Sequence, residues 1–264
     1  MKKFLVIGNP IKHSLSPELH NYWFRENNIE AVYDKKELNE DDLGKLIFEI
    51  KNKTIHGFNI TVPFKKSIIP HLEKLTPEAE ITQSVNTVYQ KDNKIIGDNT
   101  DIYGFMMSIK NLKLNVKGKK VLILGAGGVV SSIIFALNKM NVSNIIICNR
   151  TKTKAYNLKK TFRDLTIIDW GEIPDFDLVI NATSIGLKEN DNINLDFSKV
   201  GKNKFFYDLI YNPEETNFLK TGKELGSITE NGKLMFIYQA QLAFEIWHGI
   251  KPLINNKVIK LLRQ

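Results

Sequence analysis

The sequence has a single cysteine and no long apolar run. Because Cys148 is alone among the 264 residues, no disulfide can form within the chain. It ends the apolar run 145–147, so we predict a buried strand thiol and a reducing cytoplasm as the place where the protein acts. No run reaches the ~18 apolar residues of a membrane-spanning helix, and residues 1–8 read as a first strand, not a signal peptide. A disulfide scaffold and a membrane protein are therefore excluded.

Signals for metal and nucleic-acid binding are also missing. The five histidines and the cysteine form no cluster with ligand spacing, which predicts no structural metal. The net charge is +8, but the lysines are scattered along the chain and accompany no recognisable nucleic-acid module. We expect a lysine-rich solvated surface, or a weak steering of anionic ligands, and neither a nucleic-acid nor a membrane partner.

What the sequence does contain is an alternation of short apolar runs with stretches of helical period. This alternation predicts an α/β fold with mainly parallel sheets, in two parts. In the first part we predict strands near residues 4–8, 31–33, 57–62, 86–89 and 94–97, and helices near 17–27, 41–51, 65–75 and 100–112. In the second part we predict strands near 121–124, 144–148, 166–168, 178–181 and 205–208, and helices near 129–140 and 152–162. Two last helices, near 234–247 and 254–262, are expected to return the chain toward the first part.

The segment 57–65 begins as a strand and ends at a lysine. Apolar and polar residues alternate along it, in the order Phe58, Asn59, Ile60, Thr61 and Val62. Alternation places Asn59 and Thr61 on one face, and we expect the strand to stop at Pro63, which has no N–H to donate. An amide, a hydroxyl and the Lys65 ammonium at one strand end suit a polyhydroxylated substrate. The alternative is an amphipathic edge strand followed by a solvated lysine.

Two serines precede the first predicted helix. Ser16 is expected to be its N-cap, with Pro17 at the first helical position. Ser14 is not needed for capping, so the two hydroxyls at the positive end of the helix make a plausible carboxylate cradle. For Ser16 the alternative is the cap alone.

A further polar cluster, residues 97–101, contains two aspartates. Either aspartate could simply begin the helix that follows. Alternatively, Asp101 pairs with Lys65, and such a pair beside a hydroxyl can take its proton while a hydride leaves to a nicotinamide. Asn86 could bond another hydroxyl, and Gln239 lies in a helix among apolar residues, where its amide needs a partner.

A glycine-rich turn opens the first helix of the second part, at Gly125, Ala126, Gly127 and Gly128. Its position between a strand and a helix suits a pyrophosphate at a helix N-terminus, although Val130 replaces the third glycine of the usual motif. An NAD site usually has an acid after the next strand, to bind the ribose 2′-hydroxyl. The residues that follow that strand here are Asn149, Arg150, Thr151 and, one turn on, Lys154. Two cations and no acid predict NADP rather than NAD, with Thr151 capping the next helix.

Together, these segments resemble the shikimate dehydrogenase family, in order and along nearly the whole chain. The matching stretches are residues 8–10, 13–17, 59–65, 85–87, 97–101, 125–128, 149–151, 181–183, 207–208 with Tyr211, and 239–240. Each stretch is modest alone, whereas their joint occurrence is highly specific.

The resemblance implies NADP-dependent interconversion of 3-dehydroshikimate and shikimate, a step of aromatic amino acid biosynthesis. It implies that Lys65 and Asp101 form the catalytic pair, with Lys65 as the usual proton donor or acceptor. The residues it implies around the substrate are Ser14, Ser16, Asn59, Thr61, Asn86, Asp101, Tyr211 and Gln239. Those it implies around the cofactor are Gly125, Ala126, Gly127, Gly128, Val129, Asn149, Arg150, Thr151, Lys154, Thr183, Leu209 and Gly232.

The resemblance also implies two domains separated by a cleft. The first is an α/β substrate-binding domain, residues 1–100, completed by C-terminal helices in 240–264. The second is a Rossmann-type NADP-binding domain with a parallel sheet, residues 101–239. The small-molecule substrate is the expected partner, and a monomer and a homodimer both stay open.

Three other functions share parts of this pattern. A quinate/shikimate dehydrogenase must accept an extra ring hydroxyl and often uses NAD, and Ser14 and Arg150 argue against it. A non-catalytic metabolite-binding module on the same fold would not need both Lys65 and Asp101. A folate-type dehydrogenase would share the two-domain plan but not the serine pair together with the asparagines.

Overall fold

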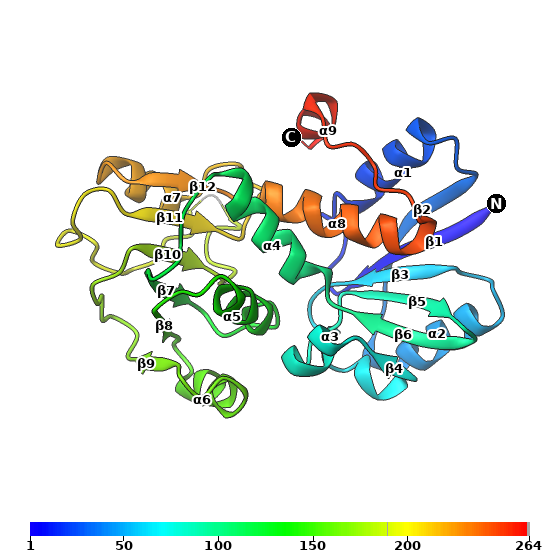
Figure 1. Cartoon of the computed structure of the whole chain (residues 1–264), viewed down its shortest axis with the longest axis horizontal. Helices are drawn as coiled ribbons and strands as arrows, with labels where there is room; N and C mark the ends of the chain where they lie inside the picture. Colours follow the sequence, from blue (N-terminus) through cyan, green and yellow to red (C-terminus); the bar gives the residue numbers. More distant parts are fainter. Residues whose placement is uncertain (189, 263–264) are drawn as a thin grey trace. The chain divides into compact units, whose positions relative to one another are not determined.

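The computed structural model of the chain describes residues 1–188 and 190–262, in which strands alternate with helices (Figure 1). Its strands are β1 (Lys2–Gly8), β2 (Ala31–Glu37), β3 (Gly57–Ile60), β4 (Lys74–Leu75), β5 (Thr87–Lys91), β6 (Lys94–Asp98), β7 (Lys120–Leu124), β8 (Asn144–Cys148), β9 (Thr166–Ile168), β10 (Leu178–Asn181), β11 (Phe205–Asp208) and β12 (Ile228–Glu230). Its α-helices are α1 (Ser16–Glu26), α2 (Leu43–Lys51), α3 (Pro77–Thr82), α4 (Thr100–Asn111), α5 (Val130–Lys139), α6 (Lys152–Thr161), α7 (Asn217–Glu224), α8 (Lys233–His248) and α9 (Asn256–Leu261).

Most elements expected from the sequence are confirmed. Strands β8 to β11 have the predicted bounds, and the other predicted strands differ by a few residues at their ends. The elements that the sequence pattern does not reveal are β4, β12, α3 and α7. None is longer than eight residues, which is too short for a clear hydrophobic period.

The α-helix predicted over residues 65–75 is wrong. The chain forms turns there, followed by a single 3₁₀ turn at Ile69–His71. Pro70 explains the difference, because a proline inside a helix has no N–H to donate and its ring clashes with the preceding turn. Lys65 is therefore carried by a loop that follows β3 and not by a helix.

The predicted end of the strand that carries Asn59 is also corrected. β3 ends at Ile60, and Val62 lies beyond it, 61% exposed, instead of on the apolar face. The Phe64 N–H donates to the Thr61 carbonyl at 3.1 Å, which closes a turn directly after the strand. The Phe64 side chain, 3% exposed, takes the buried place that the alternation assigned to Val62.

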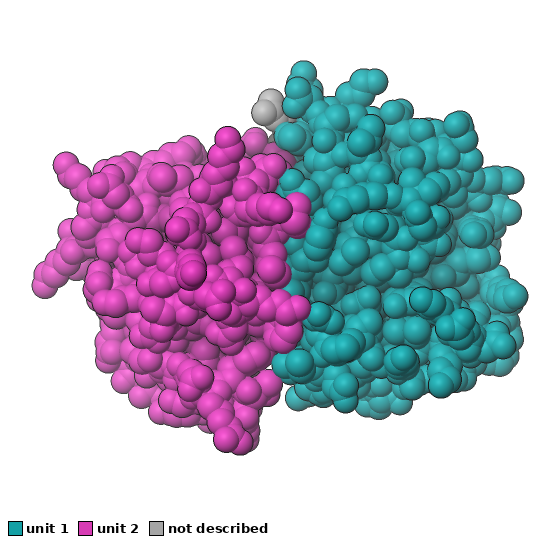
Figure 2. Space-filling view, viewed as in Figure 1, with its two compact units in different colours: residues 1–104, 237–263 teal, residues 105–236, 264 magenta. Residues whose placement is uncertain are grey.

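The chain divides into two compact units, coloured separately in Figure 2. The first unit contains residues 1–104 together with the segment that begins at Ile237, and the second contains residues 105–236. The chain thus leaves the first unit and later rejoins it. Within the described residues, none of the helices has the length and apolar character needed to cross a membrane.

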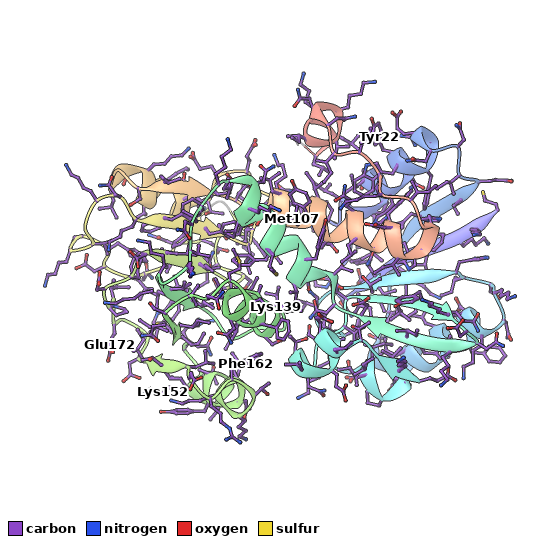
Figure 3. All side chains as sticks on the ribbon, viewed as in Figure 1. Tyr22, Met107, Lys139, Lys152, Phe162 and Glu172 are labelled. Carbon is purple, nitrogen blue, oxygen red and sulfur yellow. The ribbon has the colours of Figure 1, made fainter. Side chains whose placement is uncertain are left out.

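The second unit is built on a six-stranded parallel sheet in the order β12-β11-β10-β7-β8-β9. Counted within the unit, this order is the one of dinucleotide-binding folds, in which ligands bind where the order reverses, at the carboxyl ends of the central strands. The reversal falls between β7 and β10. Helix α5 connects β7 to β8, α6 connects β8 to β9, and α7 connects β11 to β12. Phe162, labelled in Figure 3, follows α6 and is buried. The Rossmann-type architecture predicted for this part is confirmed.

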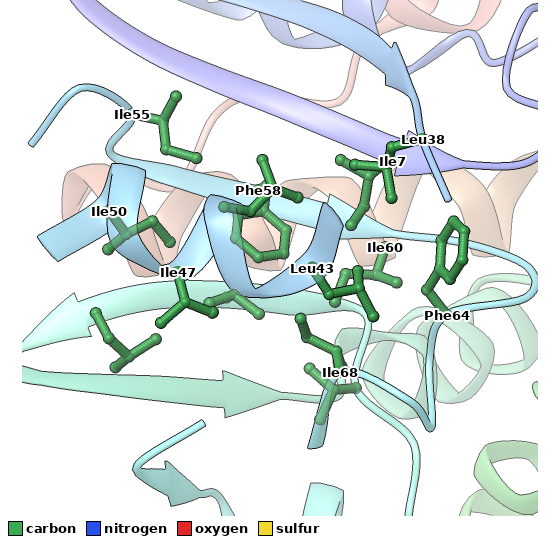
Figure 4. Packing of buried hydrophobic residues seen from close by; sticks show 14 of the residues in the cluster. Ile7, Leu38, Leu43, Ile47, Ile50, Ile55, Phe58, Ile60, Phe64 and Ile68 are labelled. Carbon is green, nitrogen blue, oxygen red and sulfur yellow. The ribbon is translucent and has the colours of Figure 1, made fainter. Parts of the chain in front are cut away.

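The first unit is built on a mixed sheet in the order β2-β1-β3-β5-β6-β4, in which β5 is antiparallel to both neighbours. Helix α2 packs on one face through Leu43, Ile47 and Ile50, which meet Phe58 and Ile60 of β3 (Figure 4). Side chains alternate along a strand, so the residue between Phe58 and Ile60 points to the opposite face. The predicted α/β fold class is confirmed in both units.

Aromatic side chains from α1 and α8 cover that opposite face. The ring of Tyr33 on β2 lies parallel to His20 of α1, with 4.3 Å between centroids, and Phe244 and Trp247 of α8 lie within 6.1 Å of His20. Gly57 begins β3 beneath α8, where a Cβ would stand 2.5 Å from the Trp247 indole nitrogen. This close approach requires a residue without a side chain at the start of β3.

We predict that this aromatic face makes folding stability fall at acidic pH. Burial, with the nearby His248, lowers the pKa of His20 to about 3, so the folded state binds fewer protons than the unfolded state between pH 6.5 and 3. Stability from neutral His20 is therefore fully present above its unfolded pKa and is lost as the pH falls, by up to about 1.4 kcal/mol per pH unit. Urea unfolding at several pH values measures this slope.

The His20→Phe variant should flatten the slope, because an aromatic ring without a titratable nitrogen fills a similar space. The exposed His71→Gln variant is the matched control for loss of an imidazole outside the cluster. An unchanged slope in His20→Phe would contradict the assignment of the pH dependence to His20.

Candidate active site

Polar side chains of the first unit meet at one end of its sheet. The strand β3 ends there, the antiparallel strand β5 begins there, and β6 ends there just before α4. The register pairs Asn59 with Thr87, and Thr87 with Asp98. Strand direction and register therefore bring together residues that are far apart in the sequence.

Lys65 and Asp101 form an ion pair at this sheet end. The Lys65 Nζ donates to Asp101 Oδ2 at 2.5 Å, and the two side chains are only 12% and 8% exposed. Asp98 is engaged elsewhere, since its Oδ1 accepts a hydrogen bond from the Thr76 hydroxyl at 2.9 Å. Of the two aspartates, the structure thus pairs Asp101 with the lysine. A nearly dry ion pair needs further hydrogen bonds to be stable.

Asn86 supplies one such hydrogen bond, to Asp101. Its Nδ2 donates to Asp101 Oδ1 at 2.9 Å and lies 2.9 Å from the Thr100 hydroxyl and 3.3 Å from Gln239 Oε1. Its Oδ1 accepts from the Thr100 N–H at 2.8 Å, which fixes the orientation of the amide. Gln239 of α8 therefore has the polar partner that its position among apolar residues demands. One amide thus connects α4, which carries Thr100 and Asp101, with Gln239 of α8.

The predicted role of Ser16 as an N-cap is wrong. Helix α1 begins at Ser16 itself, and the N-cap position is Leu15. The Ser14 hydroxyl accepts a hydrogen bond from the Ser16 N–H at 3.3 Å, so Ser14 does the work that the sequence assigned to Ser16. The two hydroxyls also lie 3.3 Å from each other. Both serines therefore stand at the positive end of α1, where an anion is favoured.

Asn59 is held by three partners. Its Nδ2 donates to the Asn86 carbonyl at 3.1 Å and to the Thr87 hydroxyl at 2.9 Å. Its Oδ1 accepts from the Tyr33 hydroxyl at 2.7 Å. Thr61, half-buried just after β3, packs its methyl group only 2.5 Å from where a Cβ on Gly8 would be. Gly8 is thus needed for the close approach of this loop to β1.

The glycine turn of the second unit lies at the point where the strand order reverses. Gly125 follows β7 with a φ of +110°, and a Cβ there would stand 2.9 Å from the carbonyl oxygen of Ala182, which follows β10. Both the backbone angle and the close approach require glycine at position 125. Gly127 and Gly128 differ, because a Cβ on either would meet no protein atom closer than 4.0 Å. Both are exposed in front of α5. The open space beside them fits a pyrophosphate at the N-terminus of that helix.

The residues after β8 offer positive charge and no carboxylate. Arg150 and Lys154 are exposed, and neither forms an ion pair with another residue in the described ranges. Lys152, labelled in Figure 3, is instead paired with Asp169. Thr151 occupies the N-cap position of α6, but its side chain makes no capping bond, so that part of its predicted role is wrong. The donor set fits a 2′-phosphate beside Asn149, Arg150 and Lys154.

The other predicted cofactor residues lie at strand ends of the same sheet: Thr183 follows β10, Leu209 follows β11, Gly232 follows β12, and Val129 lies between β7 and α5. The Thr183 N–H and hydroxyl both donate to Asn181 Oδ1, at 3.1 and 2.7 Å, and Val129 precedes α5 at its N-cap position. A Cβ on Gly232 would stand 2.1 Å from the Leu209 carbonyl oxygen. Glycine is therefore obligatory at position 232 for the backbone to pass Leu209.

Tyr211, predicted to lie near the substrate, belongs to the second unit. Its ring stacks on Phe236, with 4.7 Å between the ring centroids. The structure thus groups the predicted substrate residues in the first unit, apart from Tyr211.

Sequence reasoning assigned no role to Tyr33, and it named Asp208 only as part of a matching stretch. Asp208 ends β11 and accepts hydrogen bonds from Thr216 Oγ1 at 2.6 Å, Asn181 Nδ2 at 3.0 Å and the Ile210 N–H at 2.9 Å. Burial raises the pKa of Asp208 to about 6. The position of Asp208 at the end of an apolar strand is a sequence feature that could have marked it as a buried carboxylate. The sequence around Tyr33 carries no signal, because its partners come from other elements.

The fold and the two sites define an α/β dinucleotide-binding oxidoreductase. Two family models match the chain: "Shikimate dehydrogenase substrate binding domain" over residues 6–88 and "Shikimate / quinate 5-dehydrogenase" over residues 108–209. The chain belongs to the shikimate dehydrogenase family.

Individual relatives agree with this assignment. The chain is 62% identical to the shikimate dehydrogenase (NADP(+)) of Pelagibacter ubique, over 99% of this chain and 98% of the relative. The crystal structure of shikimate dehydrogenase from Aquifex aeolicus is 35% identical and matches with a TM-score of 0.90, covering 100% of this chain and 98% of that one. The enzyme from Thermus thermophilus, solved in complex with NADP(H) and shikimate, is 31% identical with a TM-score of 0.88, covering 96% and 95%.

Proposed function

We propose that this protein interconverts 3-dehydroshikimate and shikimate with NADP, and that Lys65 and Asp101 are its acid–base pair. The observation that carries the proposal is the ion pair of 2.5 Å between these side chains, nearly buried at a sheet end lined with amides and hydroxyls. A binding module needs no proton-transfer group, whereas alcohol oxidation does. Membership of a family of NADP-dependent dehydrogenases supports the same reaction.

The pair handles the proton of the reacting oxygen. When shikimate is oxidised, the O–H and C–H bonds at one ring carbon break and a C=O bond forms. The proton passes to the Lys65–Asp101 pair, and NADP⁺, when bound, would supply the hydride acceptor. In the reverse direction the pair returns a proton to the carbonyl oxygen as it becomes a hydroxyl. Asp101, oriented by Asn86, holds Lys65 in place for both directions.

We propose that the substrate is oriented from two sides. Ser14 and Ser16, at the positive end of α1, would bind the carboxylate. The ring hydroxyls would be bound by Asn59, Thr61, Asn86, Asp101 and Gln239, with Tyr211 as a further contact. The carboxylate then fixes the ring so that one hydroxyl reaches Lys65.

We propose that the second unit holds NADP in preference to NAD. The open space at Gly127 and Gly128 would admit the pyrophosphate, and Arg150 with Lys154 would bind the 2′-phosphate. The loops that carry Thr183, Leu209 and Gly232 would complete the cofactor site. No acid follows β8 at the position that NAD sites use for the ribose.

The test is an absorbance assay of reduced cofactor with four combinations: shikimate or quinate, each with NADP or NAD. We expect shikimate with NADP to give the highest kcat/KM. Equal rates with quinate would instead support a quinate/shikimate dehydrogenase, and equal rates with NAD would contradict the cofactor assignment. Binding of shikimate without turnover would identify a non-catalytic module.

We also propose that the enzyme acts in the cytoplasm, as a monomer or a homodimer. Its one thiol, Cys148, is buried in β8, and burial raises the pKa of Cys148 to about 11, which keeps the thiol unreactive. Light scattering on the purified chain measures its mass in solution; a larger assembly would contradict this expectation.

A further inference from the structure

Tyr33 is a buried tyrosine of β2 whose backbone and ring are both fixed. Its N–H donates to Asn21 Oδ1 at 2.9 Å, and its carbonyl accepts from Asn21 Nδ2 at 2.7 Å. Its ring stacks on His20 with an interplanar angle of 4°. Parallel stacking on His20 fixes the orientation of the Tyr33 ring, and so the position of its hydroxyl, which lies at the polar end of the sheet.

The Tyr33 hydroxyl contacts a residue proposed to bind substrate. It donates to Asn59 Oδ1 at 2.7 Å. Burial raises the pKa of Tyr33 well above its ordinary value, so the phenol keeps its proton and remains a donor to Asn59.

This contact selects one orientation of the Asn59 amide. Both amide hydrogens are directed at β5, to the Asn86 carbonyl and the Thr87 hydroxyl, while the oxygen receives the Tyr33 proton. An amide rotated by a half turn would place its NH₂ group against the Tyr33 donor and its oxygen against the Asn86 carbonyl. In the observed orientation, Asn59 offers a ligand the remaining acceptor capacity of its oxygen.

We propose that Tyr33 is a positioning residue for substrate recognition. Its hydroxyl fixes the orientation of Asn59, which would accept a hydrogen bond from a ring hydroxyl of the substrate. The position of this acceptor is thereby set by a rigid aromatic residue. Tyr33 is 2% exposed and acts through Asn59. The inference rests on the proposed function, in which Asn59 contacts shikimate.

The first test is the Tyr33→Phe variant, which removes one oxygen and keeps the stacked ring. We expect the KM for shikimate to rise roughly tenfold, because Asn59 loses the donor that fixes the orientation of its amide. The kcat should stay within about threefold and the KM for NADP should not change, since neither Lys65 nor Asp101 contacts Tyr33 through the bonds lost. If Tyr33 only stabilised the fold, the variant would have a lower thermal unfolding temperature, but its KM for shikimate would not rise while kcat stayed nearly constant.

Tyr207→Phe is the matched control. Tyr207 is also fully buried, and its hydroxyl lies 2.9 Å from the Ser108 hydroxyl in the second unit. The variant therefore loses a comparable buried hydrogen bond, but in the second unit, whereas Asn59 belongs to the first. We expect it to lower the thermal unfolding temperature and to leave the KM for shikimate unchanged.

A double-mutant cycle with Asn59→Ala tests whether Tyr33 acts through Asn59. We expect the double variant to raise the KM for shikimate by clearly less than the product of the single effects. Multiplicative effects, or a Tyr33→Phe KM equal to that of the wild type, would overturn the proposal. Turnover of shikimate by the wild type, measured first, reports separately on the proposed function.

Discussion

Replacing Lys65 by alanine is expected to lower kcat for shikimate oxidation by about a thousandfold, within the range of general acid–base catalysis. The KM for shikimate should change much less, because the carboxylate and the other ring hydroxyls keep their proposed partners. Such a pattern reports an interaction made in the transition state. Steady-state kinetics with NADP, at saturating and at low shikimate, measure both constants.

Lys66→Ala is the matched control for this experiment. Lys66 is the next residue in the same loop and is exposed, so its loss removes a positive charge of the same kind without touching Asp101. Its kcat should equal that of the wild type. The Lys65→Ala variant should remain folded, since Asp101 still accepts a hydrogen bond from Asn86 at 2.9 Å. An unchanged kcat in Lys65→Ala would remove Lys65 from the mechanism.

Replacing Arg150 by alanine is expected to raise the KM for NADP by roughly 10- to 100-fold, as expected from loss of a hydrogen bond to a charged group. The KM for shikimate and the kcat at saturating NADP should stay close to their original values. The KM for NAD should change little, because NAD has no 2′-phosphate. The ratio of NADP to NAD specificity therefore falls in the variant.

Arg163→Ala tests whether the effect belongs to the position or to charge in general. Arg163 follows α6, is exposed, and carries the same charge on the same unit. We expect both nucleotide KM values to be unaffected by its loss. Equal weakening of NADP and NAD in Arg150→Ala would show that Arg150 does not read the 2′-phosphate.

The sequence predicts most of the fold because its periods are local properties. The apolar strands β8 and β10, and the helical period of α4, follow from neighbouring residues alone. The error at residues 65–75 has a local cause too: apolar residues recur at helical spacing there, and Pro70 overrides them. Short elements such as β4 and α3 exist because tertiary packing holds them.

The site is predicted unevenly, for a physical reason. Lys65 and Asp101 stand in polar segments beside predicted strand ends, so sequence can nominate them, and the structure brings them within 2.5 Å. Tyr33 cannot be nominated in this way. Its role depends on the sheet register and on the aromatic rings around it, and the residues next to Tyr33 in the sequence predict neither of these.

The return of the chain to the first unit at Ile237 has a consequence for protein synthesis. All residues of the second unit are contiguous, so its whole sheet is available as soon as residue 236 has left the ribosome. The first unit begins to emerge earlier but lacks α8, whose Phe244 and Trp247 cover the aromatic face. Until α8 has been made, Trp23 lacks its contact with Phe244 and Tyr33 lacks its contact with Trp247. The aromatic face of the first unit can therefore be completed only after the whole second unit has been synthesised.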